Sequence, residues 1–465
     1  MKEYDVIAVG TGSVMSVVTQ VLNDDPDTDI AVIEKDEPGG ICLTRGCIPS
    51  KMILYPAEIT KHIKESGKFG IRSKINKIDF KSIMKRMKQH TMGESKNIGN
   101  NLKNSEHLDF YHTTGEFIDD HTLKVGKEKI KGDKILICSG SQPTIPPIKG
   151  LSDVDYLTSR EFLDLKSVPK SMTIIGGGYI AAEYGFFMAM MGCDVTIIGR
   201  NIQFVPGEEE EISNVLEKKL SEDMDIYTGF EVKEVKKGIR GISVIAENRE
   251  GKKIKKKSEK ILIAAGRSSN AEYLKPERTG VEMDENGWIK VDENLATTKE
   301  NIWAMGDAIG GYLFKHVANY EANVVYSNAF QNRDEKVDYH AVPHAVFTYP
   351  EVASVGMKEK EARKDHEIMV GYERYSNTAK GSAMKAEDYF VKVIVEQETY
   401  RILGAHIVGP QASVLIQEII NLMYTSKQNM IPIYRGMHIH PSMSEVVERA
   451  FFNLHSHEHS HEHNH

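Results

Sequence analysis

The chain has 465 residues, of which 40% are hydrophobic and 27% charged, with a formal net charge of -8 and four cysteines. This length predicts several domains in a soluble globular protein. The charge argues against a nucleic-acid partner, the cysteine count excludes a structural disulfide framework, and no apolar run has the length of a membrane span. Because the chain opens on strand-like residues rather than a signal peptide, we expect a cytoplasmic protein.

The first segment has the pattern strand, glycine turn, helix and strand. Gly10 and Gly12 let the backbone approach a pyrophosphate at the helix N-terminus, next to Ser13. Ser16 stands where a third glycine is usual, and its small side chain still allows the helix to pack on the strand. Glu34 ends the second strand, 24 residues after Gly10. It is therefore expected to hold the ribose hydroxyls of an adenosine group.

Two thiols follow closely, Cys42 and Cys47, with Pro49 just beyond them. Cysteines at this spacing can close a small disulfide ring if the backbone turns between them. Pro49 suits the first turn of a helix, so Cys47 is expected near a helix N-terminus, where thiolate is favoured over thiol. The alternatives are half a zinc site or two buried cysteines. Zinc needs further ligands at matching spacing, and there is no second cysteine pair.

A second unit of strand, glycine turn and helix contains Gly176, Gly178 and Ala181. Its next strand ends in Gly199 and Arg200, where a protein that binds NAD usually has an acidic residue. Arginine at this place can pair with a 2′-phosphate, which favours NADPH over NADH. The alternative is a solvated surface arginine.

Two short segments look like crossovers that return from the nucleotide-binding units. One contains Cys138 and Gly140, and the other contains Gly266. Cys138 is expected to be a small buried residue of its turn, and Cys193 a core residue between helix and strand. From about residue 340 the pattern changes to alternating strands followed by a helix over 413–423, which predicts a separate α+β domain.

These features together resemble the flavin-dependent pyridine nucleotide-disulfide oxidoreductases over the chain up to about Asn453. The likeness rests on both glycine turns and on five further motifs: the cysteine segment ending in Cys47-Ile-Pro-Ser-Lys51, Ala265-Gly-Arg267, Ile302-Trp-Ala-Met-Gly-Asp307, Phe347-Thr-Tyr-Pro-Glu351 and His438-Ile-His-Pro-Ser-Met-Ser-Glu445. Within this group the sequence is most similar to dihydrolipoamide dehydrogenases, with mercuric reductases and glutathione-reductase-like enzymes as relatives.

The resemblance implies an α/β fold with two Rossmann-like domains, for FAD and NAD(P), and a C-terminal α+β dimerisation domain. The expected boundaries are 1–145 and 266–338 for the two parts of the FAD domain, 146–265 for the NAD(P) domain, 339–454 for the dimerisation domain and 455–465 for a tail. FAD is expected on the first glycine turn, Glu34, Gly140 and Asp307. NADP or NAD is expected on the second turn, with Gly266 close to a cofactor.

The resemblance also implies a homodimer with a shared active site. Lys51 would approach FAD and pair with Glu183. His440 would come from the partner subunit as acid/base beside the outer cysteine, oriented by Glu445, because a carboxylate on the far imidazole nitrogen fixes the tautomer. Without the family context, a His-x-His-Pro run is more simply a metal ligand pair or a structural turn.

The implied reaction is a relay between nicotinamide, FAD, the Cys42–Cys47 disulfide and a small dithiol or disulfide substrate. Dihydrolipoamide is the first expectation for that substrate. Thr44 and Arg45 depart from the usual Asn-Val of lipoamide enzymes, and Arg45 is expected to favour the thiolate. An NADPH-dependent reductase of another low-molecular-weight disulfide is therefore the runner-up. A mercuric reductase is less favoured, because the terminal Cys-Cys pair of that group is missing.

The C-terminal tail alternates histidine with polar residues, and the family does not explain it. Imidazoles can bind Zn, Ni or Cu. The alternatives are a polar tail without function, or a non-enzyme in which the chain serves mainly as a metal-handling protein. No other metal site is predicted. The histidines concerned are His455, His457, His459, His461, His463 and His465.

Overall fold

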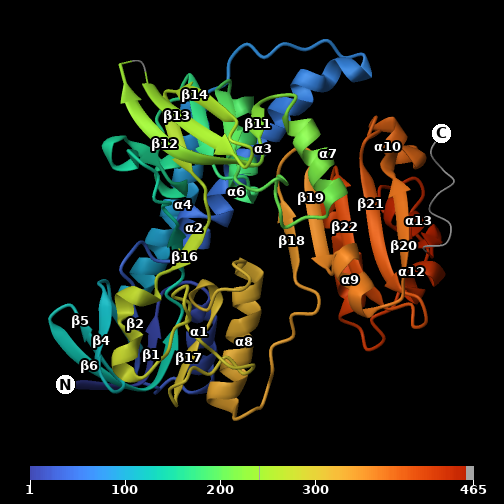
Figure 1. Ribbon diagram of the computed structural model, residues 1–465. Helices are drawn as coiled ribbons and strands as arrows, with labels where there is room; N and C mark the ends of the chain where they lie inside the picture. The colour runs from blue at the N-terminus through green and yellow to red at the C-terminus, as the bar shows by residue number, and fades with distance from the viewer. Residues whose placement is uncertain (240, 457–465) are drawn as a thin grey trace.

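A computed structural model describes residues 1–239 and 241–456, and Figure 1 shows their arrangement. The chain forms an N-terminal unit, a middle unit and a C-terminal unit, each built around its own sheet. His455 lies in the final strand, whereas the other five histidines of the predicted metal-binding tail lie outside the described residues. Among the described helices, none is long and apolar enough to cross a membrane.

The N-terminal unit has a seven-stranded sheet whose parallel strands are buried on both faces, as their near-continuous apolar sequences predict. Parallel pairing of the first two strands sets Val6 beside Ile30 and Val9 beside Ile33, so both strands end at the same edge. In spatial order the strands are β3 (Leu108–Tyr111), β2 (Ile30–Ile33), β1 (Lys2–Val9), β6 (Glu128–Ile137), β5 (Thr122–Val125) and β4 (Gly115–Asp119), with β17 (Ile302–Ala304) pairing β6.

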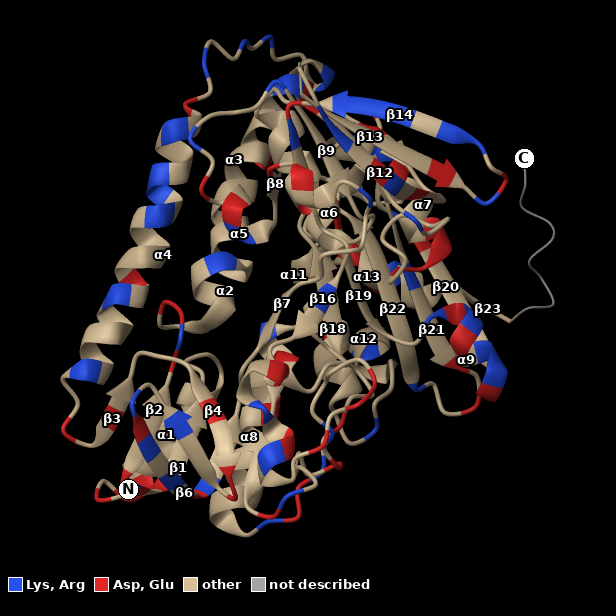
Figure 2. Ribbon diagram, turned by 60° about the vertical axis from the view of Figure 1, so that its left-hand side comes forward, with Lys and Arg blue, Asp and Glu red and all other residues tan. Residues whose placement is uncertain are grey.

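Helices α1 (Val14–Asp24) and α8 (Lys315–Gln331) pack together on this sheet, although they are almost 300 residues apart in the sequence. The chain thus returns to the N-terminal unit after forming the middle unit. Two further helices contain the cysteine segment, α2 (Gly40–Arg45) and α3 (Cys47–Glu65), and α4 (Phe80–Lys103) packs against both. Figure 2 shows a row of Lys and Arg along α4.

The middle unit repeats the parallel arrangement with a five-stranded sheet. Its strands are, in spatial order, β11 (Asp225–Tyr227), β10 (Asp194–Ile198), β9 (Ser171–Ile175), β15 (Lys260–Ile263) and β8 (Tyr156–Leu157). A three-stranded antiparallel sheet lies beside it, formed by β12 (Phe230–Gly238), β13 (Gly241–Asn248) and β14 (Lys253–Ser258). The helices of this unit are α5 (Ser159–Phe162), α6 (Tyr179–Met190) and α7 (Glu210–Leu220).

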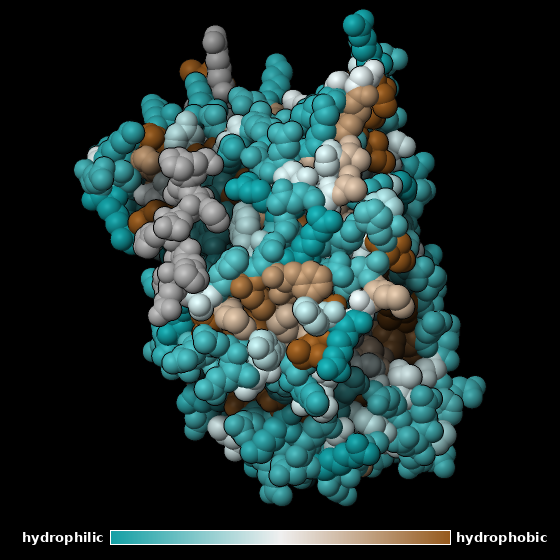
Figure 3. Space-filling view, turned by 90° about the vertical axis from the view of Figure 1, so that its right-hand side faces the viewer, coloured by the Kyte–Doolittle hydropathy of each residue, from teal (hydrophilic) through white to brown (hydrophobic). Residues whose placement is uncertain are grey.

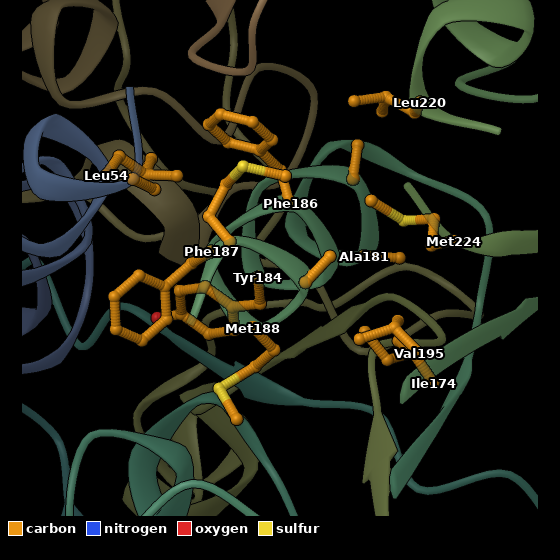
Figure 4. Close-up of a cluster of buried hydrophobic side chains, with 14 of the residues drawn as sticks. Leu54, Ile174, Ala181, Tyr184, Phe186, Phe187, Met188, Val195, Leu220 and Met224 are labelled. Carbon is orange, nitrogen blue, oxygen red and sulfur yellow. The ribbon is translucent and has the colours of Figure 1, made fainter. Parts of the chain in front are cut away.

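Helix α6 is apolar on all sides and lies in the largest hydrophobic cluster, as such a helix must. Figure 4 shows Tyr184, Phe187 and Met188 of α6 among side chains from α3 and from the strands of the middle sheet. Contact between α3 and α6 therefore joins the cysteine segment to the middle unit. Cys193 is buried in this same cluster, as the sequence predicted.

The C-terminal unit is the α+β domain expected from the sequence. Its six strands are, in spatial order, β18 (Pro343–Val346), β19 (Glu351–Gly356), β22 (Ile402–Gly409), β21 (Phe390–Glu396), β20 (Ile368–Arg374) and β23 (Leu454–His455). Its helices are α9 (Glu359–Asp365), α10 (Ala379–Ala383), α11 (Ala412–Met423), α12 (Ile431–Arg435) and α13 (Glu445–Phe452).

Shorter elements connect the units. A two-stranded ladder pairs β7 (Ser141–Pro143) with β16 (Arg267–Ser269), so the two predicted crossover segments lie side by side. The 3-10 turns are at Ser66–Phe69, Leu151–Asp153, Ala271–Leu274, Pro276–Thr279, Gly306–Ala308 and Tyr375–Asn377. The chain thus passes between the N-terminal and middle units through these two paired segments.

Candidate active site

A cavity of about 1150 Å³ lies where the three units meet, and it collects most of the predicted site residues. Its walls come from the first glycine turn, α2 and α3, the start of α6, the start of α8, β18 and α11. The predicted residues on its lining are Gly10, Gly12, Ser13, Glu34, Cys42, Cys47, Lys51, Gly140, Glu183 and Asp307.

The first glycine turn has the backbone that its sequence predicts. Gly10 adopts a φ of 104°, and a Cβ there would come within 2.4 Å of the Cys138 carbonyl oxygen, so only glycine fits. Gly12 faces open space, which leaves room for a phosphate. Glu34 accepts hydrogen bonds from the Thr11 amide at 3.0 Å and hydroxyl at 2.7 Å, which fixes its carboxylate beside the turn.

The cavity wall also has buried polar atoms without a hydrogen-bond partner among the described residues, as expected for a site that binds FAD. Asn270 is 7% exposed and its Oδ1 atom has no partner among the described residues, and the Ser139 hydroxyl is also buried without one. Both residues line the cavity. Since buried polar atoms are nearly always paired, these two point to a polar ligand.

The two cysteines are free thiols in contact with each other, and α3 begins at Cys47 as expected. Gly39 and Gly40 have positive φ, and a Cβ on Gly40 would lie 2.8 Å from the Cα atom of Gly12, so the cysteine segment packs directly on the glycine turn. A hydrogen bond from Cys42 and the charge of Lys51 lower the pKa of Cys47 to about 7. The hydrogen bond to Cys47 and burial raise the pKa of Cys42. Cys47 is therefore the thiolate of the pair.

Lys51 and Glu183 form the ion pair that the resemblance implies. The Lys51 Nζ atom lies 2.9 Å from both carboxylate oxygens of Glu183 and 4.4 Å from the centre of the Phe347 ring. The Phe347 amide donates to the same carboxylate at 3.0 Å. The pair thus joins α3, α6 and the end of β18 at one point of the cavity wall.

Arg45 is paired with two carboxylates near it in the sequence. Its guanidinium forms ion pairs with Asp36 and, at 3.4 Å, with Glu37. Arg160 of the middle unit lies 3.6 Å from the same Asp36. These two carboxylates compensate the charge of Arg45, and Lys51 is the cation whose charge lowers the pKa of Cys47. That Arg45 favours the thiolate stays a prediction.

Asp307 lies in a 3-10 turn and is held by two residues that sequence reasoning did not assign. Ser141 donates a hydrogen bond to its carboxylate, and the Arg267 Nε atom lies 3.8 Å from it. Arg267 also donates to the Ser141 hydroxyl at 2.7 Å. The signal for Arg267 was present, because it ends the Ala-Gly-Arg motif. Nothing in the sequence around Ser141 marked its role.

Cys138 lies in the turn after β6, as predicted, and packs against the core of the N-terminal unit. It is only half-buried and also lines the cavity, and burial raises the pKa of its thiol to about 11. Two aromatic residues on the same wall were also missed, Tyr179 at the start of α6 and Phe314 just before α8. A third thiol in the cavity is thus present but held in its protonated form.

The second glycine turn lies outside this cavity, at the end of β9. A Cβ on Gly176 would come within 2.0 Å of the Ala264 carbonyl oxygen, and Gly266, like Gly176, has a positive φ. Gly178 precedes the first residue of α6, and Ala181 is fully buried where α6 packs on the sheet. Arg200 follows β10 and is exposed. The turn and Arg200 therefore lie at the edge where a nucleotide binds in this fold.

His440 and Glu445 are preassembled away from the cavity of their own chain. The His440 Nδ1 atom lies 2.9 Å from Glu445 Oε1, and the Ser442 amide donates to the second carboxylate oxygen at 3.2 Å. The His440 side chain is 70% exposed, whereas that of Glu445 is 8% exposed. The hydrogen bond with His440 lowers the pKa of Glu445. Among residues 1–239 and 241–456, no hydrogen-bond partner is found for the Nε2 atom of this exposed imidazole.

Comparison with known proteins identifies the class. The family described as "Pyridine nucleotide-disulphide oxidoreductase" matches residues 4–322, and the corresponding dimerisation domain matches residues 342–451. The chain belongs to this family. It is an FAD-dependent oxidoreductase that works with NAD(P)H, and the dimerisation domain supports a homodimer. Among the described residues, no group of three or more His, Cys, Asp or Glu is arranged to hold a metal ion.

The similar proteins include enzymes named for different substrates. Mycothione reductase of Mycobacterium tuberculosis is 33% identical over 467 residues, which cover 98% of this chain and 100% of the relative. Dihydrolipoyl dehydrogenase of Bacillus subtilis is 30% identical and covers 96% and 97%. Mercuric reductase of Staphylococcus aureus is 30% identical and covers 89% and 76%. The solved HOCl-induced flavoprotein disulfide reductase RclA from Escherichia coli has a TM-score of 0.85 at 27% identity and covers 96% and 99%.

Proposed function

We propose that the protein is an NADPH-dependent reductase of a low-molecular-weight disulfide, with Cys42 and Cys47 as its redox pair. The observation that carries this proposal is the lowered pKa of Cys47 next to Lys51, in a cavity that also contains the first nucleotide-binding turn. The mycothione reductase relative, which matches over its whole length, supports a small disulfide as substrate. Such chemistry needs a reducing compartment, so we place the enzyme in the cytoplasm.

When bound, FAD supplies the two-electron step between nicotinamide and the cysteines. The Lys51–Glu183 ion pair links α3 to α6 on the cavity wall and keeps the positive charge of Lys51 beside Cys47. Its compact ion pair orients the lysine without leaving a buried carboxylate unpaired. We assign both residues to positioning the redox pair and the cofactor.

In the substrate half of the reaction, the partner's His440 takes the proton of the Cys42 thiol, whose pKa is raised. The resulting Cys42 thiolate attacks the disulfide and forms a mixed disulfide with one half of it. The departing thiolate takes a proton from the partner's His440, which Glu445 holds in the required tautomer. Cys47 then attacks Cys42, which restores the internal disulfide and releases the second thiol. The balance is one NADPH, one proton and one disulfide consumed for one NADP⁺ and two thiols formed.

Arg200 supports NADPH as the nucleotide. It is exposed at the end of β10, and no carboxylate of the described residues lies within ion-pair distance of it. A free guanidinium at this position suits a 2′-phosphate, whereas NADH would favour an acidic residue there.

Dihydrolipoamide oxidation with NAD⁺ is the second candidate. It is supported by the motif resemblance and by dihydrolipoyl dehydrogenase relatives of full length. The two candidates differ in nucleotide and in substrate, so one set of assays distinguishes them.

The test is steady-state turnover with NADH or NADPH, crossed with lipoamide and a panel of small disulfides, for wild type and Arg200→Glu. We expect NADPH to be preferred, and the substitution to raise its KM by about tenfold or more through loss of the phosphate contact. A preference for dihydrolipoamide and NAD⁺ that Arg200→Glu leaves unchanged would overturn the proposal in favour of the second candidate.

A further inference from the structure

Lys315 is the first residue of α8, and its side chain lines the cavity. Its Nζ atom donates to the Ser13 hydroxyl at 2.8 Å, and Ser13 in turn donates to Asn319, one turn further along α8, at 2.9 Å. Ser13 itself precedes α1. The N-termini of α1 and α8 therefore meet at Ser13, and both dipoles place partial positive charge there.

The charge of Lys315 is not compensated by an acidic side chain. Lys51 pairs with Glu183, Arg267 with Asp307 and Arg45 with Asp36, so these three cavity cations are neutralised. Lys35 lies over the Tyr273 ring at 4.2 Å. Within residues 1–239 and 241–456, no carboxylate lies within ion-pair distance of Lys315. Such a charge, half-buried on the wall of the cavity, favours negative charge in the space next to it.

A second observation points to a ligand in the same cavity. The unpartnered Oδ1 atom of Asn270 lies on the cavity lining with Lys315, and it belongs to a residue that is 93% buried. The charge of Lys315 also acts within the cavity, because it opposes the hydrogen bond and burial that raise the pKa of Cys42. Lys315 is thus close to both the glycine turn and the redox pair.

We propose that Lys315 is an FAD-binding residue whose ammonium group compensates negative charge of the bound dinucleotide, either on its pyrophosphate or on the reduced isoalloxazine ring. This inference rests on the FAD dependence of the family and not on the proposed substrate. A lysine at this position would tune the cofactor through charge, in addition to the helix dipole.

The test compares wild type with Lys315→Gln, Lys315→Arg and the surface control Lys336→Gln. The dissociation constant of FAD is measured by fluorescence titration of the apoprotein, and the two-electron midpoint potential of the holoprotein by equilibration with a reference dye. Lys336 pairs with Glu293 at 2.7 Å, so it tests loss of an ordinary surface lysine.

If the charge faces the pyrophosphate, Lys315→Gln should weaken FAD binding about tenfold with little change of potential. If it faces the reduced ring, the potential should fall by about 30 mV per tenfold loss of stabilisation, with FAD binding nearly unchanged. Lys315→Arg should keep both values close to wild type.

The proposal is overturned if Lys315→Gln matches wild type and Lys336→Gln in both quantities. It is equally overturned if Lys315→Arg loses FAD affinity or potential as much as Lys315→Gln does, since charge would then not be the cause. Circular dichroism of each apoprotein verifies folding, and the arginine variant keeps the test decisive if the glutamine variant fails to fold. Substrate preference enters neither measurement.

Discussion

Cys47 has two cations near it in sequence, Arg45 and Lys51, and the charge of Lys51 lowers the pKa of its thiol. Arg45 is occupied by Asp36 and Glu37, whereas Lys51 lowers the pKa of Cys47 together with the hydrogen bond from Cys42. A thiol with a pKa of about 7 is roughly half ionised at neutral pH. The reactivity of the pair should therefore depend strongly on pH around neutrality.

We predict that alkylation of Cys47 in the reduced enzyme slows as the pH falls below about 7, because the thiolate is lost there. Lys51→Met should move the midpoint of this profile to higher pH. Arg45→Leu is the matched control and should leave the midpoint in place. The measurement is the rate of iodoacetamide labelling against pH, followed by mass spectrometry of the Cys47 peptide. A shift with Arg45→Leu and none with Lys51→Met would reverse the assignment.

At the scale of elements, the segment before α7 joins the middle unit to the C-terminal sheet. Glu208 is 2% exposed and accepts hydrogen bonds from His344 at 2.7 Å and from Ser354 at 2.5 Å. His406 continues the network, with its Nδ1 atom 3.1 Å from the Ser354 hydroxyl. Although burial acts to raise the pKa of Glu208, the bonds from His344 and Ser354 lower it overall. The contact therefore stabilises the folded enzyme while Glu208 is ionised.

We predict that Glu208→Gln lowers stability by about 2 kcal/mol at neutral pH, the usual contribution of hydrogen bonds to a buried charged group. Because the folded-state pKa of Glu208 is depressed, its contribution is present above the unfolded value of about 4.3 and is lost as the pH falls below it. As the pH is lowered below this value, the apparent Tm of the variant should therefore fall less steeply than that of the wild type. Glu210→Gln, at an exposed position of the same acidic run, is the control. Identical pH profiles for wild type and Glu208→Gln would contradict this account.

The sequence predicted elements well where the backbone itself carries the constraint. The glycine turns at Gly10 and Gly176 and the start of α3 at Cys47 follow from local residue chemistry, and the structure has them where the sequence predicts them. The sequence did not predict the ion pairs of Arg45 with Asp36 and Glu37, or the place of Cys138 on the cavity lining, because both depend on the direction of a side chain, which the local sequence pattern does not give. The network of Glu208 was missed because it joins four distant segments.

At the scale of the whole molecule, the C-terminal unit presents an apolar surface. Figure 3 shows an apolar patch on the face that looks to the right of Figure 1, surrounded by hydrophilic residues. Exposed apolar side chains of this unit include Val414, Tyr434, Met437, Ile439 and Phe452. The dimerisation-domain match gives this surface a natural occupant, a second copy of the chain. His440 directly follows Ile439 in the sequence and is also exposed.

We predict that two inactive variants, Cys42→Ser and His440→Gln, restore activity to each other in a mixed dimer. If the imidazole acts across subunits, one of the two active sites of the heterodimer regains both Cys42 and the partner's His440. Co-expressed, differently tagged chains would be purified as heterodimers and assayed for disulfide reduction. An active His440→Gln homodimer, or an inactive heterodimer of correctly assembled chains, would contradict a shared site.

The most direct test of the redox pair is the labelling of cysteines after anaerobic addition of one equivalent of NADPH per subunit to the oxidised enzyme. We expect alkylation then to appear on Cys42 and Cys47 and not to increase on Cys138 or Cys193. The variants Cys42→Ser and Cys47→Ser should retain FAD but gain no NADPH-dependent label. Reduction of the FAD by NADPH without any new thiol at Cys42 and Cys47 would contradict this expectation.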